Sequence, residues 1–196
     1  MPNDICKSCT IKTLRVHDDP VRPDIKPKSS LLFLIDFPII EDIDSGIILS
    51  GITNRRVRFI HSIMKDAKLN DVHVSYASVL RCITKSKAII TMNNYETCSG
   101  HLLRDLEKSN IKMVISFGSV AGSVMTGEKI KSVDYVRGKI TDSVIPGIKN
   151  MTTYSLSVAT DGTGCSSCNF SKLYPSLILK DVISAAKELN MRSIWM

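Results

Sequence analysis

A continuous apolar run at Leu31–Ile35 (LLFLI) constrains the fold of this chain more than any other segment. Two serines precede the run and an acidic loop follows it, which is the pattern of a β-strand buried on both faces. Such a strand needs a layer of helices on each side of its sheet, because neither face is left in water. The run therefore predicts an α/β protein with a mostly parallel sheet.

The rest of the chain alternates between segments with strand pattern and segments with helical pattern. The further predicted strands are 72–80, 112–117, 139–144 and 149–154, and the predicted helices are 54–68, 96–109, 119–125 and 175–189. Strands separated by helices of roughly 10 to 15 residues indicate a parallel sheet covered on both faces. We expect one domain, 1–196, with a three-layer α/β/α fold and a central, mostly parallel sheet of four to five strands.

The charge and the apolar runs narrow the class of protein. The 196 residues include 26 lysines and arginines against 19 acidic residues, a formal net charge of +7, which favours an anionic partner. The apolar runs are far shorter than the roughly 20 residues of a membrane span, and no apolar signal segment follows Met1. We therefore expect a cytoplasmic protein with no membrane partner.

Six cysteines in a chain of this kind favour metal ligands or free thiols over a disulfide framework. Two sets of four thiolates are possible, and both contain the pair Cys6-x2-Cys9. Adding the second C-x2-C motif, at 165–168, makes a zinc-like site, which spacing alone favours. Adding Cys82 and Cys98 instead makes a site that suits an iron–sulfur cluster as readily as zinc.

Several motifs in a fixed order resemble those of the family 4 uracil-DNA glycosylases over nearly the whole chain. In that family a strand is followed by Gly-x-x-Ala, a short helix, Gly-Glu-Lys and Arg-Gly, and the matching residues here are 115–118, Ala121, 127–129 and 137–138. The family's final amphipathic helix is matched by 179–189. Its cluster ligands are an N-terminal C-x2-C, a strand-end cysteine and a cysteine sixteen residues further on, which is the separation of Cys82 from Cys98.

The resemblance implies a 4Fe-4S cluster held by Cys6, Cys9, Cys82 and Cys98, with zinc as the alternative. Such a cluster would be structural, and it would tie the loop-rich segment 1–30 to the core. The motif at 165–168 then has no assigned role. We expect two free thiols there, with a second metal site or a redox pair as the alternatives.

Cleavage of the bond between a base and its sugar develops positive charge on the sugar and negative charge on the base. An enzyme needs a carboxylate or a positioned water on the sugar side, and hydrogen-bond donors at the base oxygens, once the base is flipped out of the stack. By the resemblance, Asp36 is the water-positioning carboxylate, and Phe37 and Pro38 belong to the base pocket. The two glycines that flank this loop in the family are Ile35 and Ile39 here, which crowd the approach of a ligand.

Three other positions of the family's site are changed. The aromatic residue that stacks on the flipped base corresponds to Leu49, and the asparagine that reads its edge corresponds to Ser78. The catalytic histidine has no counterpart here, since all four histidines lie before residue 102. By register from Gly147, its position is Ser155. Loss of a donor of this kind typically lowers the rate on the order of a hundredfold or more.

The expected DNA-binding residues lie in two regions of the chain. They are Gly118, Ser119, Arg137 and Gly138 by the resemblance, and Arg55 and Arg56 by their clustered charge. The first functional hypothesis is a divergent, largely inactive glycosylase-like module that binds single- or double-stranded DNA or a protein partner in replication or repair. The alternative is an active DNA glycosylase that uses Asp36. The high content of isoleucine and lysine is typical of an AT-rich genome. Divergent members of the family that the chain resembles occur in phages, and a phage-encoded protein would lie in the host cytoplasm.

Overall fold

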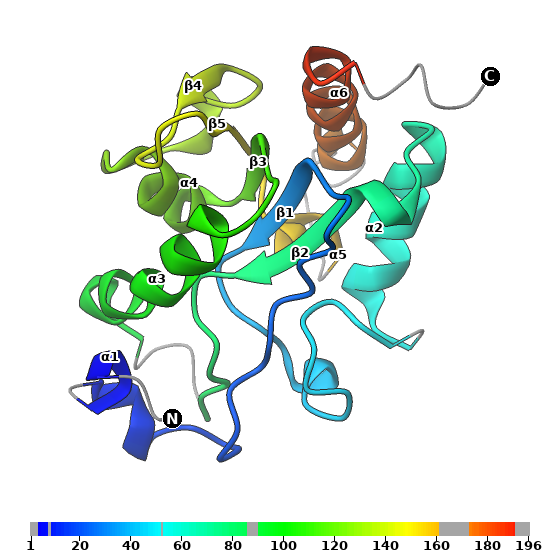
Figure 1. Cartoon of the computed structure of the whole chain (residues 1–196). Coiled ribbons are helices and arrows are strands. Elements are labelled where there is room, and N and C mark those ends of the chain that lie inside the picture. The colour runs from blue at the N-terminus through cyan, green and yellow to red at the C-terminus, as the bar shows by residue number, and fades with distance from the viewer. Residues whose placement is uncertain (1–3, 8, 52, 86–89, 161–172, 191–196) are drawn as a thin grey trace.

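The computed structural model describes residues 4–7, 9–51, 53–85, 90–160 and 173–190 (Figure 1). Within these residues five strands form one sheet in the order β2-β1-β3-β5-β4. The strands are β1 (Leu31–Ile35), β2 (Val74–Ser78), β3 (Met113–Phe117), β4 (Ile140–Asp142) and β5 (Lys149–Thr153). All neighbours pair in parallel except β4, which is antiparallel to β5 at one edge. The predicted mostly parallel sheet is confirmed.

Helices cover both faces of the sheet, as the sequence predicts. The α-helices are α1 (Asp4–Lys7), α2 (Arg55–Asp66), α3 (Met92–Glu107), α4 (Ser119–Thr126), α5 (Leu156–Thr160) and α6 (Leu173–Glu188). In Figure 1, α3 and α4 lie on one side of the sheet, and α2, α5 and α6 lie on the other. The arrangement is a three-layer α/β/α fold. No helix in the described part of the chain is long and apolar enough to cross a membrane.

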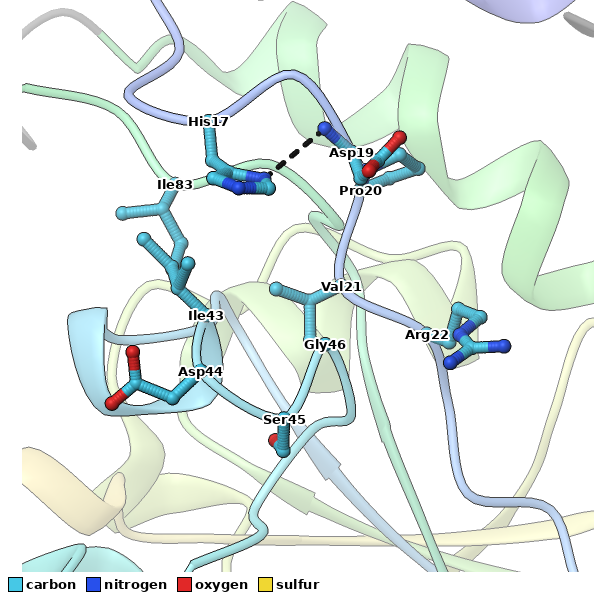
Figure 2. Close-up of a pocket in the computed structure, with 10 residues that line it drawn as sticks. All are labelled: His17, Asp19, Pro20, Val21, Arg22, Ile43, Asp44, Ser45, Gly46 and Ile83. Atoms are coloured by element: carbon cyan, nitrogen blue, oxygen red, sulfur yellow. Dashed lines mark hydrogen bonds between the residues drawn. The ribbon is translucent and has the colours of Figure 1, made fainter.

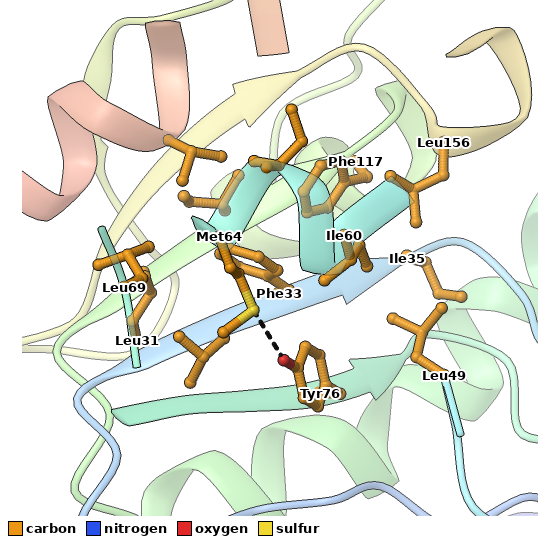
Figure 3. Close-up of a cluster of buried hydrophobic side chains, with 14 of the residues drawn as sticks. Leu31, Phe33, Ile35, Leu49, Ile60, Met64, Leu69, Tyr76, Phe117 and Leu156 are labelled. Carbon is orange, nitrogen blue, oxygen red and sulfur yellow. Dashed lines mark hydrogen bonds between the residues drawn. The ribbon is translucent and has the colours of Figure 1, made fainter. Parts of the chain in front are cut away.

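Two apolar clusters meet at β1, because alternate side chains of a strand point to opposite faces. Leu31, Phe33 and Ile35 belong to the cluster that packs against α2 and α6 (Figure 3), and Leu32 and Leu34 belong to the cluster under α3 and α4. No side chain of β1 is more than 2% exposed. The prediction of a strand buried on both faces is confirmed.

Helix α3 and strand β2 differ from their predicted bounds, and helix α5 was not predicted, each for a local reason. Helix α3 begins at Met92, before the predicted start at 96, because the Asn94 side chain accepts a hydrogen bond from the Thr91 N–H (2.8 Å) and caps the first turn. Strand β2 begins two residues late, because Asp71–His73 forms a 3-10 turn. Helix α5 was not predicted, since five residues are too few to show a helical period.

The N-terminal segment between Cys9 and Asp24, which we call the strap, lies along the end of β2 and against α3. The Val16 N–H donates to the Ile83 carbonyl, the Val21 N–H donates to the Arg81 carbonyl, and Asp24 exchanges two backbone hydrogen bonds with Tyr76. At its start, the Asn94 amide on α3 donates to the Thr10 hydroxyl (2.7 Å). Protein contacts therefore hold the loop-rich segment to the core.

The loop between β1 and α2 is organised by the fully buried carboxylate of Asp42. Its two oxygens accept hydrogen bonds from the Ile39 N–H (2.9 Å), the Leu49 N–H (2.8 Å) and the Asn54 side chain (3.2 Å). Asn54 in turn caps α2, since its side-chain oxygen accepts from the backbone N–H groups of the first turn. One carboxylate thus sets both the path of the loop and the start of the helix.

The variant Asp42→Ala should lower the free energy of unfolding by about 3 kcal/mol, because it leaves three donors, two buried and one partly buried, without their acceptor. Chemical denaturation measures the difference. The matched control is Asp44→Ala, two residues further on and exposed, which should stay within about 0.5 kcal/mol of the parent. Equal losses in the two variants would show that Asp42 does not organise the loop.

Candidate functional site

The candidate site lies where the carboxyl ends of the parallel strands meet. The chain leaves β1 toward β2 on one side, and β3 lies on the other side, so the ends of β1 and β3 flank a topological switch point, where α/β proteins commonly bind ligands. A small cleft opens there. Its lining residues are Ile35, Asp36, Phe37, Arg56, Phe117, Ser155, Leu156 and Ser157. Its volume is ≈ 10 Å³, about the space of one water molecule.

Asp36 is the acidic residue of the cleft, and it directly follows β1. One oxygen of its carboxylate accepts a hydrogen bond from the Ala121 N–H in the first turn of α4 (2.8 Å). Burial raises the pKa of Asp36 to about 6, although the Ala121 N–H and the charge of Arg56 both lower it. A carboxyl group with a raised pKa in a cleft is a candidate for acid–base chemistry.

The space for this carboxylate depends on Gly118, the residue after β3. Its φ is +114°, a conformation that side chains rarely adopt, and a Cβ atom there would lie 2.7 Å from Oδ2 of Asp36. Any side chain at 118 would therefore displace the carboxylate. Gly118 and Ser119, which the family resemblance assigns to DNA binding, form the start of α4 beside Asp36.

Arg56 supplies the positive charge of the cleft. Its side chain is only 4% exposed, although it lies in the first turn of α2. The guanidinium carbon lies 5.2 Å from the centroid of the Phe37 ring, and Nη1 donates to the Phe37 carbonyl (3.3 Å). This geometry is a cation–π contact. The neighbouring Arg55, predicted with Arg56 to bind DNA, is exposed.

Of the residues assigned to the family's site, the structure brings Asp36, Phe37 and Ser155 to the cleft. The Ser155 hydroxyl shares a hydrogen bond with the Ser157 hydroxyl (2.9 Å). Pro38 follows directly and is buried. These residues converge because the segments after β1 and β5 leave the sheet at the same edge.

The other two base-pocket positions do not line this cleft, although Ser78 lies beside Ile35, its partner in the parallel pairing of β1 with β2. Ser78 ends β2 and is 3% exposed, and Leu49 has φ +52° and lines a separate hollow of ≈ 220 Å³ with Tyr76 and His61. Among the described residues, neither belongs to the lining of the Asp36 cleft. The positions that would read and stack on a base are therefore not assembled with the carboxylate.

The Arg137 side chain, predicted to contact DNA, is engaged within the protein. Its guanidinium pairs with the buried Asp181 (2.9 Å) and donates to the Leu177 carbonyl (3.3 Å). Asp181 also accepts from the Thr153 hydroxyl (2.7 Å), and a Cβ atom at Gly138 would lie 2.8 Å from it. The Arg-Gly pair thus joins α6 to the end of β5.

The four cysteines of the predicted cluster come from three segments of the chain. Cys6 lies in α1 and Cys9 begins the strap, whereas Cys82 follows β2 and Cys98 lies on α3. Cys9 and Cys82 pack against the apolar cluster that contains Cys98, and the Sγ atom of Cys6 lies 3.3 Å from Nε2 of His101. Burial, followed by the neighbouring thiols, raises the pKa of Cys98, to about 11.

The fit of these residues to a metal is partial. The donor chemistry fits, since cysteine thiolates hold both iron–sulfur clusters and zinc. Within the described residues, however, no three histidine, cysteine or acidic side chains are grouped as metal ligands would be. The alternative pair, Cys165 and Cys168, lies outside the described residues.

The largest hollow that we describe, ≈ 440 Å³, was not predicted (Figure 2). Its lining residues come from the strap (His17, Asp19, Pro20, Val21, Arg22), from the loop before α2 (Ile43, Asp44, Ser45, Gly46) and from Ile83 after β2. Figure 2 shows the His17 ring near Ile83, with its Nδ1 accepting from the Asp19 N–H (3.2 Å). No local sequence signal marks this hollow, because three distant segments enclose it.

Comparison with known proteins adds no assignment at this point. No protein-family model matches the chain, and no curated protein matches it significantly.

The variant Asp36→Asn should make the protein more stable at pH 8, by on the order of 2 to 3 kcal/mol. The pKa of Asp36 is raised from 3.8 to about 6 on folding, so the folded state binds the proton more tightly than the unfolded state. Ionised Asp36 therefore lowers the stability of the parent progressively between pH 4 and pH 6, and fully above that window. Asparagine carries no charge at any of these pH values.

Denaturation of parent and variant from pH 4 to pH 8 provides the measurement. The stability difference should be smallest at pH 4, where folded Asp36 is protonated, and should grow through pH 6. A difference that stays constant over this range would mean that the Asp36 carboxylate is not destabilised by burial.

Proposed function

We propose that this chain is a DNA-binding protein of the uracil-DNA glycosylase type that carries a 4Fe-4S cluster and has a closed base pocket. It acts by binding DNA, or a protein partner, in replication or repair. The observation that carries the proposal is the state of the Asp36 cleft: it has room for one water, and Arg56 fills the space beside Phe37. A flipped base does not fit beside these side chains.

Support for the glycosylase type comes from where the expected residues lie. Asp36 and Phe37 follow β1 and Ser155 follows β5, and these two distant segments meet at the carboxyl edge of the sheet. The resemblance assigns these positions to one site. The same resemblance explains why the site is incomplete, since Leu49 and Ser78 replace its stacking and base-reading residues.

Support for DNA as the partner comes from charge. The chain has a formal net charge of +7, and Arg55 and Arg58 are both exposed at the start of α2. Contacts with phosphates add affinity that depends on salt and not on sequence. This is the type of binding that a module without base readout retains.

The cluster would be held by Cys6, Cys9, Cys82 and Cys98. When bound, it would supply a rigid cross-link between the N-terminal segment, the end of β2 and α3. The strap already joins these elements through hydrogen bonds, so the cluster would strengthen an existing junction. None of these four cysteines lines the Asp36 cleft, which supports a structural role for the cluster.

A second candidate function is hydrolysis of an N-glycosidic bond, and the state of Asp36 favours it. With a pKa of about 6, Asp36 is mostly ionised at neutral pH, and the cleft leaves about one water's space next to it. The carboxylate would accept a proton from that water as its oxygen bonds to the sugar carbon. The base would leave with the electrons of the broken bond, and the Ser155 hydroxyl would donate to it.

Titration of fluorescent single- and double-stranded oligonucleotides over a range of salt concentrations tests DNA binding. We expect affinity to fall steeply with salt, and the double variant Arg55→Ala/Arg58→Ala to reduce the salt slope by about 2, one for each lost phosphate contact. The matched control is Lys65→Ala, an exposed cation at the other end of α2. A flat salt response would contradict the DNA-binding proposal.

Cleavage of uracil-containing oligonucleotides, extended to other modified bases, separates the two candidate functions. The binding proposal expects intact DNA with every base tested. Cleavage product that is lost in Asp36→Ala would instead establish glycosylase activity and overturn the proposal that the protein only binds.

Metal analysis of protein purified without oxygen tests the cluster. We expect iron and acid-labile sulfide in equal amounts, and loss of both in Cys82→Ser, because a cluster needs all four thiolates. The variant Cys165→Ser serves as the control and should keep both. Stoichiometric zinc that disappears in Cys165→Ser would contradict the proposed ligand set.

A further inference from the structure

The side chain that fills the cleft beside Asp36 is a buried arginine, and arginine is rarely buried unless it is paired. We propose that Arg56 closes the nucleobase pocket: its guanidinium takes the place of a flipped pyrimidine over the ring of Phe37, and the pocket admits a base once Arg56 is shortened. The inference rests on the proposed function, since it takes the cleft for a base pocket. It names Arg56 as the residue that closes the pocket, and a pyrimidine base as the ligand for which the pocket lining is suited.

The contacts of Arg56 resemble those that a flipped base makes. A guanidinium is planar and has donors along its edge, as a pyrimidine ring has polar groups along its own edge. The guanidinium carbon lies 5.2 Å from the Phe37 ring centroid, and Nη1 donates to the Phe37 carbonyl. A base in a glycosylase pocket is held in the same two ways, by stacking on its face and by hydrogen bonds at its edge.

Arg56 is held in the cleft by its backbone as well as its side chain. The Arg56 N–H donates to the Asn54 side chain (2.9 Å), and Asn54 is bonded to the buried Asp42. These contacts set the rotation of α2 that turns position 56 inward, while Arg55 and Arg58 are exposed. The closed state is therefore built into the start of the helix.

Charge also favours this position. A cation in the first turn of a helix is disfavoured by the helix dipole, so the helix itself does not explain the burial. Two carboxylates offset that effect: burial raises the pKa of both Asp36 and Asp42, and the Arg56 charge opposes that rise at each of them. The guanidinium thus lies where a base would bind, and its charge favours the ionised form of Asp36.

Shortening the side chain should restore a pocket of suitable chemistry. In Arg56→Ala, the vacated space lies between the Phe37 ring, the Asp36 carboxylate and the Ser155 hydroxyl. A pyrimidine there would have one aromatic face for stacking, one acceptor and one hydroxyl at its edge. The variant Arg56→Met is the matched control, since it removes the charge but keeps a long side chain in the cleft.

Free uracil is the probe, and the backbone amide signals of Phe37, Ser155 and Ala121 in a two-dimensional NMR spectrum are the readout. We expect saturable shifts of these signals in Arg56→Ala, with an affinity at least about tenfold above that of the parent and of Arg56→Met. Arg56→Ala that is folded but binds uracil no better than the parent would overturn the inference, as would equal binding by Arg56→Met.

A second variant covers the case in which Arg56→Ala does not fold. Arg56→Asn keeps an amide donor on a side chain that is one atom shorter than methionine, and it should bind uracil more tightly than the parent and Arg56→Met; binding equal to the parent's would overturn the inference. The DNA titration of the parent is a separate readout. Salt-dependent DNA binding without uracil binding in the variants refutes the role of Arg56 alone, whereas uracil binding without any DNA affinity refutes the proposed function alone.

Discussion

The burial of β1 on both faces is the constraint on which the rest of the structure depends. Its alternate side chains enter two separate apolar clusters, so the strand cannot move without loss of packing on both sides of the sheet. Because β2 and β3 pair with it in parallel, the carboxyl ends of these strands open on one edge. Asp36 is the first residue beyond β1, and it is therefore held at that edge by the core.

The hydrogen bonds of Asp42 connect the fixed position of β1 to the geometry of the cleft. Asp42 binds the loop that follows Asp36, and through Asn54 it fixes the first turn of α2. The inward position of Arg56 follows from that turn. A rigid core, a buried carboxylate and a helix cap together produce a cleft that is closed in the folded protein.

The candidate site has a buried carboxylate but little room beside it. Asp36 remains in place although burial disfavours its charge, and Gly118 leaves the room that its carboxylate needs. A buried, destabilised charge at a strand end is typical of a site kept for function. At the same time, Arg56 occupies the cleft, and Leu49 and Ser78, the positions that would recognise a base, are not among its lining residues. The proposed function, binding without base readout, was inferred from these two observations.

The sequence by itself determined the elements whose signal is local. The apolar run of β1 and the helical periods of α2, α3 and α6 predicted the three-layer fold, because burial of one face or two imposes those patterns on neighbouring residues. The short α5 carried no such pattern, and the true start of α3 depended on a cap at Asn94. For the site, the resemblance placed Asp36, Phe37 and Ser155 together, and their segments do meet. Only the tertiary structure decided that Arg56 faces inward and that Leu49 and Ser78 do not reach the cleft, because these orientations depend on the buried Asp42 network and on how distant loops pack at one edge of the sheet.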